Sequence, residues 1–156
     1  MNLKERTYLL YIALLRLYFG YYLLYQGVRK YQRNFPQGDW IGRQIGDLSA
    51  ADLYPWYKHF LAEYVVPYAP SFGYVVITGE ILVGLSLLLG LFTRFSAIVG
   101  LFMLINYYLG PGTARGGAML AQQQTFIVCL VVIFLANAGR TLGLDGFLSR
   151  ASRGTR

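Results

Sequence analysis

Four long apolar stretches, each with at most one charged residue, set the class of this chain. They cover residues 8–28, 72–92, 93–109 and 120–138. A helix needs about 20 apolar residues to cross a bilayer, or about 17 at the short end. The third stretch is at this lower limit, so it either pairs with a tilted neighbour or takes residues from the loop that follows. The pattern predicts an all-α integral membrane four-helix bundle in a single domain over residues 1–156.

The connections between these stretches differ in length and chemistry. Only residues 91–94 join the second and third stretches, so these two helices are expected to be antiparallel neighbours. Residues 110–117 contain four glycines and a proline, which is typical of a loop. Residues 29–71 form the predicted extracytoplasmic loop, and residues 139–156 form a predicted cytoplasmic tail.

The centre of the 29–71 loop has the spacing of an amphipathic helix. Residues 53–65 place apolar and aromatic side chains at steps of three and four, among them Trp56, Tyr57 and Phe60. Pro55 suits a first helical turn, and we expect Pro67 to end the helix. Because Trp and Tyr favour the headgroup level, we expect this helix to lie flat over one end of the bundle. It serves either for packing alone or as a contact surface for a partner.

Composition and charge exclude several classes of function. The chain is 56% hydrophobic and 13% charged, which is typical of a membrane protein. Its net charge of +7 suits anionic lipid headgroups, and no soluble basic face is left for nucleic acid. With Cys129 and His59 as the single cysteine and histidine, the chain cannot form a disulfide, a CxxC pair or a zinc cluster of its own. We expect no metal and no covalently bound cofactor.

Two charged residues lie deep inside the apolar stretches: Arg16 in the first and Glu80 in the second. A charge buried in a membrane is costly and is a candidate functional group by default. Each lies about 12 Å into its stretch, from opposite surfaces, so in a core of about 30 Å their backbones would differ by about 6 Å in depth. We therefore predict a buried Arg16–Glu80 pair, which either fixes the helix register, or titrates at Glu80, or binds a polar head such as a quinone carbonyl or an anion at Arg16.

Small residues on the same faces support this pairing, because they let membrane helices approach closely. On the first helix the predicted interior face is Ala13, Arg16, Gly20, Leu23 and Gly27. On the second helix it is Gly73, Ile77, Glu80, Gly84, Leu87 and Leu91. Weaker polar candidates, all near the ends of stretches, are Asn106, Gln122, Gln123, Gln124 and Asn137.

An aromatic stripe is expected on the other side of the first helix. It consists of Tyr11, Tyr18, Tyr22 and Tyr25. We interpret it either as ordinary packing surface or as an interface with lipid or with a partner protein.

The motifs around these residues resemble the DoxX-like family of small four-helix membrane proteins, which includes DoxD-type subunits of thiosulfate:quinone oxidoreductase. The resemblance is carried by residues 15–30, which end in Gly27-x-x-Lys30, by residues 79–94, and by residues 137–145. The family-like positions are Gly27, Lys30, Gly79, Gly84, Gly90, Arg94, Gly139, Arg140 and Asp145.

The resemblance implies the plasma (inner) membrane of a prokaryote and, for some members, electron transfer to quinone. We expect a subunit of a redox or energy-transducing assembly that anchors other membrane subunits and lines a quinone site near Arg16 and Glu80. The alternatives are a directly participating subunit of a thiosulfate:quinone oxidoreductase, and a small transporter or proton pathway. Basic residues near the ends of the stretches slightly favour cytoplasmic termini.

Overall fold

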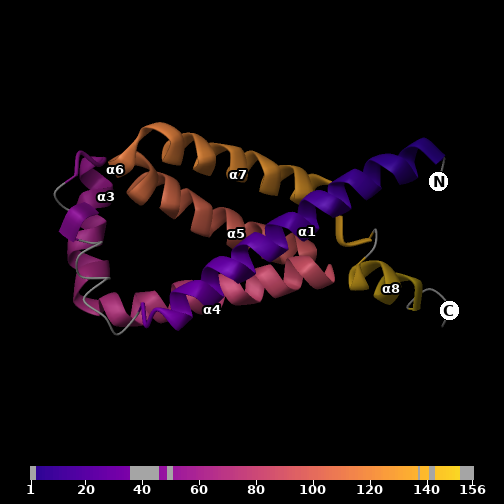
Figure 1. The fold of residues 1–156 in the computed structure, drawn as a ribbon, viewed down its shortest axis with the longest axis horizontal. Helices are drawn as coiled ribbons and strands as arrows, with labels where there is room; N and C mark the ends of the chain where they lie inside the picture. Colours follow the sequence, from indigo (N-terminus) through magenta and orange to yellow (C-terminus); the bar gives the residue numbers. More distant parts are fainter. Residues whose placement is uncertain (1–2, 36–45, 49–50, 137, 141–142, 152–156) are drawn as a thin grey trace.

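Four long helices run roughly along one axis and form the body of the molecule (Figure 1). The computed structural model describes residues 3–35, 46–48, 51–136, 138–140 and 143–151. The long helices are α1 (Leu3–Gln32), α4 (Ala69–Leu89), α5 (Thr93–Tyr107) and α7 (Gly117–Leu135), and each belongs to a segment long and apolar enough to cross a membrane. The described residues contain no strand, so the predicted all-α membrane bundle is confirmed.

The closest approach in the bundle is between α1 and α4, which pack together over most of their length. A Cβ atom added to Gly20 would lie 2.9 Å from the Gly84 carbonyl oxygen, and one added to Gly84 would lie 2.5 Å from the Leu24 amide nitrogen. The two backbones therefore touch, as small residues allow in membrane helices. Further along, Gly27 faces Glu80 and Ile81, which sets the register between the two helices.

The main core fills the space between the four helices. Phe19 and Leu23 of α1 meet Val83 and Leu87 of α4, and all four side chains are buried. Leu104, Leu130, Ile133 and Ala138 complete the cluster from α5, α7 and the turn after α7. The predicted interior faces of the first two helices are thus largely confirmed. All five residues of the first face are buried, and so are those of the second face except Leu91, which is half-buried.

The end of the bundle at α3 (Pro55–Phe60) is called the loop end here. Helix α3 lies across this end, at an angle to the long helices (Figure 1), and begins at Pro55 as predicted. The expected stop at Pro67 is wrong. The chain continues through a π-helical turn, Leu61–Val65, and a 3-10 turn, Val66–Tyr68, into α4. These irregular turns accommodate the missing amide hydrogen of Pro67 while the chain changes direction.

One side of α3 packs against the protein and the other side is exposed. Leu53, Tyr57 and Leu61 form a small buried cluster, whereas Trp56 is 60% and Phe60 38% exposed. The Tyr57 hydroxyl donates a hydrogen bond to the backbone carbonyl of Asn106 at 3.2 Å. This contact ties the loop end to the last turn of α5.

The third span is longer than its apolar stretch, because the glycine-rich loop expected at 110–117 is mostly helical. Helix α5 continues through a π-helical turn, Tyr108–Gly112, into α6 (Thr113–Arg115). The reversal of direction uses Gly116 and Gly117, which have φ angles of 58° and 49°, values that glycine adopts readily. The third span therefore takes residues from the loop, one of the two alternatives stated above.

Candidate functional site

A carboxylate, an amine and a phenol meet inside the bundle, towards the loop end. Lys30 Nζ lies 2.5 Å from Glu80 Oε1, and the Tyr107 hydroxyl donates to the same oxygen at 2.6 Å. Lys30 also donates to the Tyr107 hydroxyl at 2.9 Å. The Glu80 side chain is 2% exposed and that of Lys30 is 25% exposed. The triad joins α1, α4 and α5 and connects a buried carboxylate to a partly exposed amine.

Further polar side chains surround this triad. Gln26 donates to the Tyr22 hydroxyl at 3.3 Å. Tyr22, Gln26 and Lys30 are spaced by four residues, so they share one face of α1. Gln123 of α7 is also buried, and its Cγ and the Tyr107 carbonyl both lie beside Gly112. All four long helices thus contribute polar groups to this end of the interior.

Two acceptors in this region receive no hydrogen bond from the residues that the structure describes. They are Glu80 Oε2 and Gln123 Oε1, both fully shielded by the protein. Leaving a buried polar atom without a partner costs about 1–3 kcal/mol, and more for a charged group. A bound group that donates hydrogen bonds would recover this free energy.

The predicted pairing of Glu80 with Arg16 is wrong, although both side chains are buried as expected. Glu80 pairs with Lys30. The Arg16 guanidinium lies against Gly90, ten residues beyond Glu80 and so about 15 Å further along. The prediction aligned the ends of the apolar stretches, which would place Gly20 beside Glu80. The glycine contacts place Gly27 there instead, a shift of about two helical turns.

Arg16 belongs to a second cluster at the opposite end of the bundle, called the terminal end. Its Nη1 atom occupies the space where a Cβ on Gly90 or Gly143 would lie. Gly90 ends α4 with a φ of 64°, so glycine suits this position for both its conformation and its missing side chain. Asp145 is the acidic residue whose charge acts favourably on Arg16.

Asp145 also joins the C-terminal segment to the turn between α4 and α5. Its carboxylate accepts hydrogen bonds from the amides of Phe92 at 2.8 Å and Thr93 at 3.0 Å, at the start of α5. Its own amide donates to the Gly90 carbonyl at 2.9 Å. Asp145 belongs to the first turn of α8 (Leu144–Ala151). Its side chain nevertheless caps the start of α5, where a negative charge is favourable.

We expect Asp145→Ala to loosen the terminal end without unfolding the bundle. The substitution removes two hydrogen bonds to the start of α5, and loss of a helix cap costs about 0.5–2 kcal/mol. Hydrogen exchange in detergent should show faster exchange in residues 92–96 and 143–147. Asp52→Ala is the control, since Asp52 is exposed. Unchanged exchange in both segments would contradict the capping role.

The remaining predicted positions lie at helix contacts, on the surface, or outside the described residues. Gly27, Gly79 and Gly84 lie at contacts between helices, and Gly139 lies against Asp145 and Thr93. Arg94 is exposed, with its guanidinium 5.6 Å from the Phe134 ring centroid. The exposed tyrosines of the predicted stripe are Tyr11, Tyr18 and Tyr25. Asn137 and the side chain of Arg140 lie outside the described residues.

Tyr22 is the exception in this stripe, because it turns inwards. Its ring packs edge-on against Phe126 of α7, with centroids 4.8 Å apart. Tyr21 takes its place on the outer face and stacks on Tyr25 at 6.2 Å. The outward stripe is therefore shifted by one residue at its centre.

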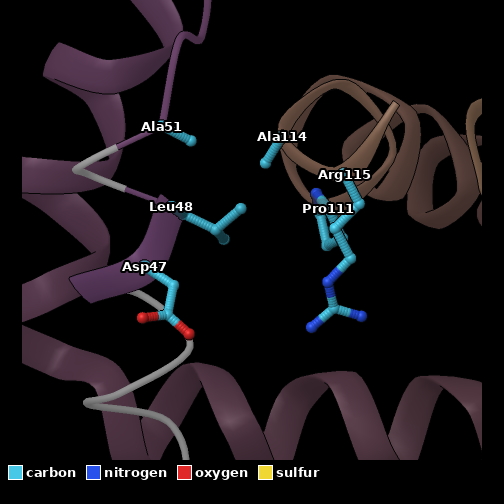
Figure 2. Close-up of a pocket in the computed structure, with 6 residues that line it drawn as sticks. All are labelled: Asp47, Leu48, Ala51, Pro111, Ala114 and Arg115. Atoms are coloured by element: carbon cyan, nitrogen blue, oxygen red, sulfur yellow. The ribbon is translucent and has the colours of Figure 1, made fainter. Parts of the chain in front are cut away.

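A cleft of about 250 Å³ opens at the loop end, between residues 47, 48 and 51 on one side and residues 111, 114 and 115 on the other. It is lined by Asp47, Leu48, Ala51, Pro111, Ala114 and Arg115. The Asp47 carboxylate and the Arg115 guanidinium project from its opposite walls, and Leu48, Ala51 and Ala114 form its apolar part (Figure 2). The sequence did not point to this cleft, because its two walls are at least 60 residues apart in the chain.

Tyr107 is the member of the triad that sequence reasoning missed. The short turn between α4 and α5 could have revealed it, because such a turn fixes which residues of the two helices are neighbours. A tight antiparallel hairpin places residues near Met103 beside Gly79, as the structure confirms, and Tyr107 follows Met103 by one helical turn. Lys30 was recognised only as a motif position. The connection over residues 29–71 is so long that it does not fix the position of α1 along α4.

Comparison with known proteins gives a family but no individual relative. The model of the DoxX family matches residues 11–109, a range that holds Lys30, Glu80 and Tyr107 and ends before Asp145. No curated protein and no solved structure matches the chain. The family model covers more than half of the 156 residues, and the chain therefore belongs to the DoxX family of membrane proteins.

Proposed function

We propose that this protein is a membrane subunit of a redox or energy-transducing assembly and that the Lys30–Glu80–Tyr107 triad binds a quinone head group. The observation that carries the proposal is the environment of Glu80. One of its oxygens accepts from Lys30 and Tyr107, and the other is buried without a donor among the described residues. The site that we propose therefore surrounds Glu80, away from Arg16.

The chemistry of the triad fits a head group with oxygens at both ends. A quinol hydroxyl can donate to Glu80 Oε2 or to Gln123 Oε1, both of which lack donors within the described chain. The Lys30 ammonium has three hydrogens, two of which are used by Glu80 and Tyr107, so one remains for a quinone carbonyl. A bound quinone would supply two-electron, two-proton redox chemistry.

The residues of the chain would then position the head group and hold protons near it. Glu80 accepts a proton at Oε2, and Tyr107 keeps its own hydroxyl proton directed at Oε1. Lys30, a quarter exposed, neutralises the carboxylate and lies between the interior and the bundle surface. Buried charges that serve proton or substrate paths commonly have this arrangement in membrane proteins.

We propose that the electrons for the quinone come from a partner subunit. The described residues include no group of three or more His, Cys, Asp or Glu side chains that could hold a metal, and Cys129 is the single thiol. We therefore propose that the protein acts with other membrane subunits in the plasma membrane of a prokaryote. The basic residues of the α4–α5 turn and of the tail support cytoplasmic termini.

Binding of a short-chain quinone to the purified protein tests the proposal. We expect Lys30→Met and Tyr107→Phe each to weaken binding of decylubiquinone or a menaquinone analogue by about ten-fold, the effect of losing one hydrogen bond near a charge. Calorimetric titration in mild detergent measures this. Tyr25→Phe is the matched control, because Tyr25 is exposed on the outer face of α1.

Equal affinity in the parent and both triad variants, with intact folding, would rule out this site.

The proton pathway is the second candidate, favoured by the chain of hydrogen bonds from Glu80 through Tyr107 to the partly exposed Lys30. Proton flux into vesicles that is lost in Glu80→Gln, together with no quinone binding, would support that function instead.

A further inference from the structure

We propose that the cleft at the loop end binds the phosphoethanolamine head group of a phospholipid, with the phosphate at Arg115 and the ammonium at Asp47. The two charged groups project from opposite walls, on the side of the cleft that Figure 2 shows below Leu48. The cleft volume of about 250 Å³ is below the range of about 300–1,000 Å³ for drug-sized ligands, so it suits a small polar group. The cleft is separate from the triad, and the proposal does not depend on quinone binding.

Packing holds the two walls of the cleft in place. Leu48 and Ala51 of one wall pack against the buried cluster at the loop end, and Ala114 of the other wall packs against the same cluster. A Cβ atom added to Gly110 would lie 3.4 Å from the Tyr57 hydroxyl oxygen and 3.8 Å from Leu48 Cδ1. The first wall is therefore seated against the end of the third span, and the cleft is a defined feature of the fold.

The two charges of the cleft are not neutralised by the part of the chain that the structure describes. Within that part, Asp47 and Arg115 form no ion pair with each other or with another side chain. Lys58 donates to the Ala51 carbonyl at 3.4 Å. Arg115 Nη1 contacts Met119 Sδ at 3.7 Å, which leaves most of the five guanidinium N–H donors for a ligand. An acid and a base held apart in this way suit a ligand that carries both charges.

The position of Arg115 favours a lipid phosphate as its ligand. Arg115 ends the candidate span Thr93–Arg115, and the next candidate span begins at Gly117. The reversal between two spans lies at the membrane surface, where lipid head groups flank a hydrocarbon core of about 30 Å. A guanidinium can bind a phosphate through two parallel hydrogen bonds. A phospholipid beside this reversal would therefore present its phosphate to Arg115.

Asp47 determines which phospholipid fits. A carboxylate beside a lipid phosphate is repelled unless the head group also carries a positive charge. The primary ammonium of phosphatidylethanolamine supplies that charge and three N–H donors. The trimethylammonium of phosphatidylcholine has no N–H donor, and the glycerol of phosphatidylglycerol has no positive charge. The apolar part of the cleft suits the two methylene groups between phosphate and ammonium. We therefore expect selectivity for phosphatidylethanolamine.

Native mass spectrometry of the detergent-purified protein tests the proposal with lipids of equal chain length. The probes are dioctanoyl phosphatidylethanolamine, phosphatidylcholine and phosphatidylglycerol. We expect phosphatidylethanolamine to bind at least about three-fold more tightly than the other two, the effect of one hydrogen bond. Phosphoethanolamine without acyl chains is the fourth probe and should bind more weakly than the lipid. Equal affinity for this soluble probe would overturn the assignment of the site to a lipid.

Two variants separate the roles of the two charges. Asp47→Asn should abolish the preference for phosphatidylethanolamine over phosphatidylcholine and leave the affinity for phosphatidylcholine unchanged. Arg115→Gln should weaken binding of all three lipids, because it removes the phosphate contact. Asp52→Asn and Arg33→Gln are the matched controls, since both side chains are exposed and lie outside the cleft.

Three results would overturn the proposal. The first is equal binding of phosphatidylethanolamine and phosphatidylcholine by the parent protein. The second is a preference that persists in Asp47→Asn. The third is a loss of affinity in Arg33→Gln equal to that in Arg115→Gln, which would indicate a general attraction of phosphates to basic residues. Asp47 and Arg115 are exposed, so thermal unfolding of these variants should match that of the parent.

Discussion

Gly84→Ala is expected to prevent close packing of α1 on α4 and to lower the yield of folded protein sharply. The added methyl carbon would lie 2.5 Å from the Leu24 amide nitrogen and 2.9 Å from the Gly20 carbonyl oxygen. Both are backbone atoms inside a helix, so they cannot rotate away as a side chain would. Overpacking typically costs about 1–3 kcal/mol, and this site is expected to exceed that range because the whole helix must move.

The measurement is thermal unfolding in mild detergent, together with the folded fraction after purification. Gly79→Ala is a matched control in the same helix, because its methyl would meet only the flexible Met103 side chain, at 3.2–3.3 Å. At position 79 the higher helix propensity of alanine can therefore stabilise α4. Equal stability of the two variants would show that the α1–α4 contact is looser than the structure places it.

The second large effect is expected at Lys30. Lys30→Met leaves the Glu80 carboxylate buried without its cation, and breaking a buried ion pair in this way costs about 3–5 kcal/mol. The lower end of that range is expected, since Lys30 is a quarter exposed. Adding Glu80→Gln removes the stranded charge, so the double variant should regain most of the stability lost by Lys30→Met.

A parallel cycle with Arg16 separates the two possible partners of Glu80. Arg16→Met and Glu80→Gln act at sites about 15 Å apart along the bundle, so their effects on the free energy of unfolding should add. The Lys30 and Glu80 changes should instead couple by more than about 1 kcal/mol. Coupling of Glu80 to Arg16 and additivity with Lys30 would reverse the assignment made from the structure.

The faces of α1 and α4 were predictable from sequence, because small residues and the two charges recur at helical spacing. Helix existence and fold class followed from the apolar stretches alone. The position of one helix along the other did not follow, because it depends on which glycines touch. Gly20 faces Gly84 and Gly27 faces Glu80. The spacing of small residues along each helix would be the same if these glycines were paired differently, so it cannot identify the register. A shift of two turns moved the partner of Glu80 from Arg16 to Lys30.

The terminal end shows a different limit of sequence reasoning. Asp145 was recognisable as a motif position, but its role depends on contacts with Phe92 and Thr93, more than 50 residues earlier. The helical course of residues 108–115 was hidden for another reason. Pro111 and the neighbouring glycines favour a loop locally, and the π-helical turn depends on tertiary packing, of Gly110 against Tyr57 and of Gly112 against Gln123.

The contact of Arg16 with Gly143 also has a consequence for the order in which the molecule assembles. Arg16 belongs to the first helix, whereas Gly143, which also lies against its guanidinium, belongs to a segment synthesised after all four candidate spans. Until that segment arrives, the charge has to remain near water or be covered by another protein. A nascent chain that stops before α8 would carry an exposed arginine inside its first span, a feature that membrane quality-control proteases could recognise.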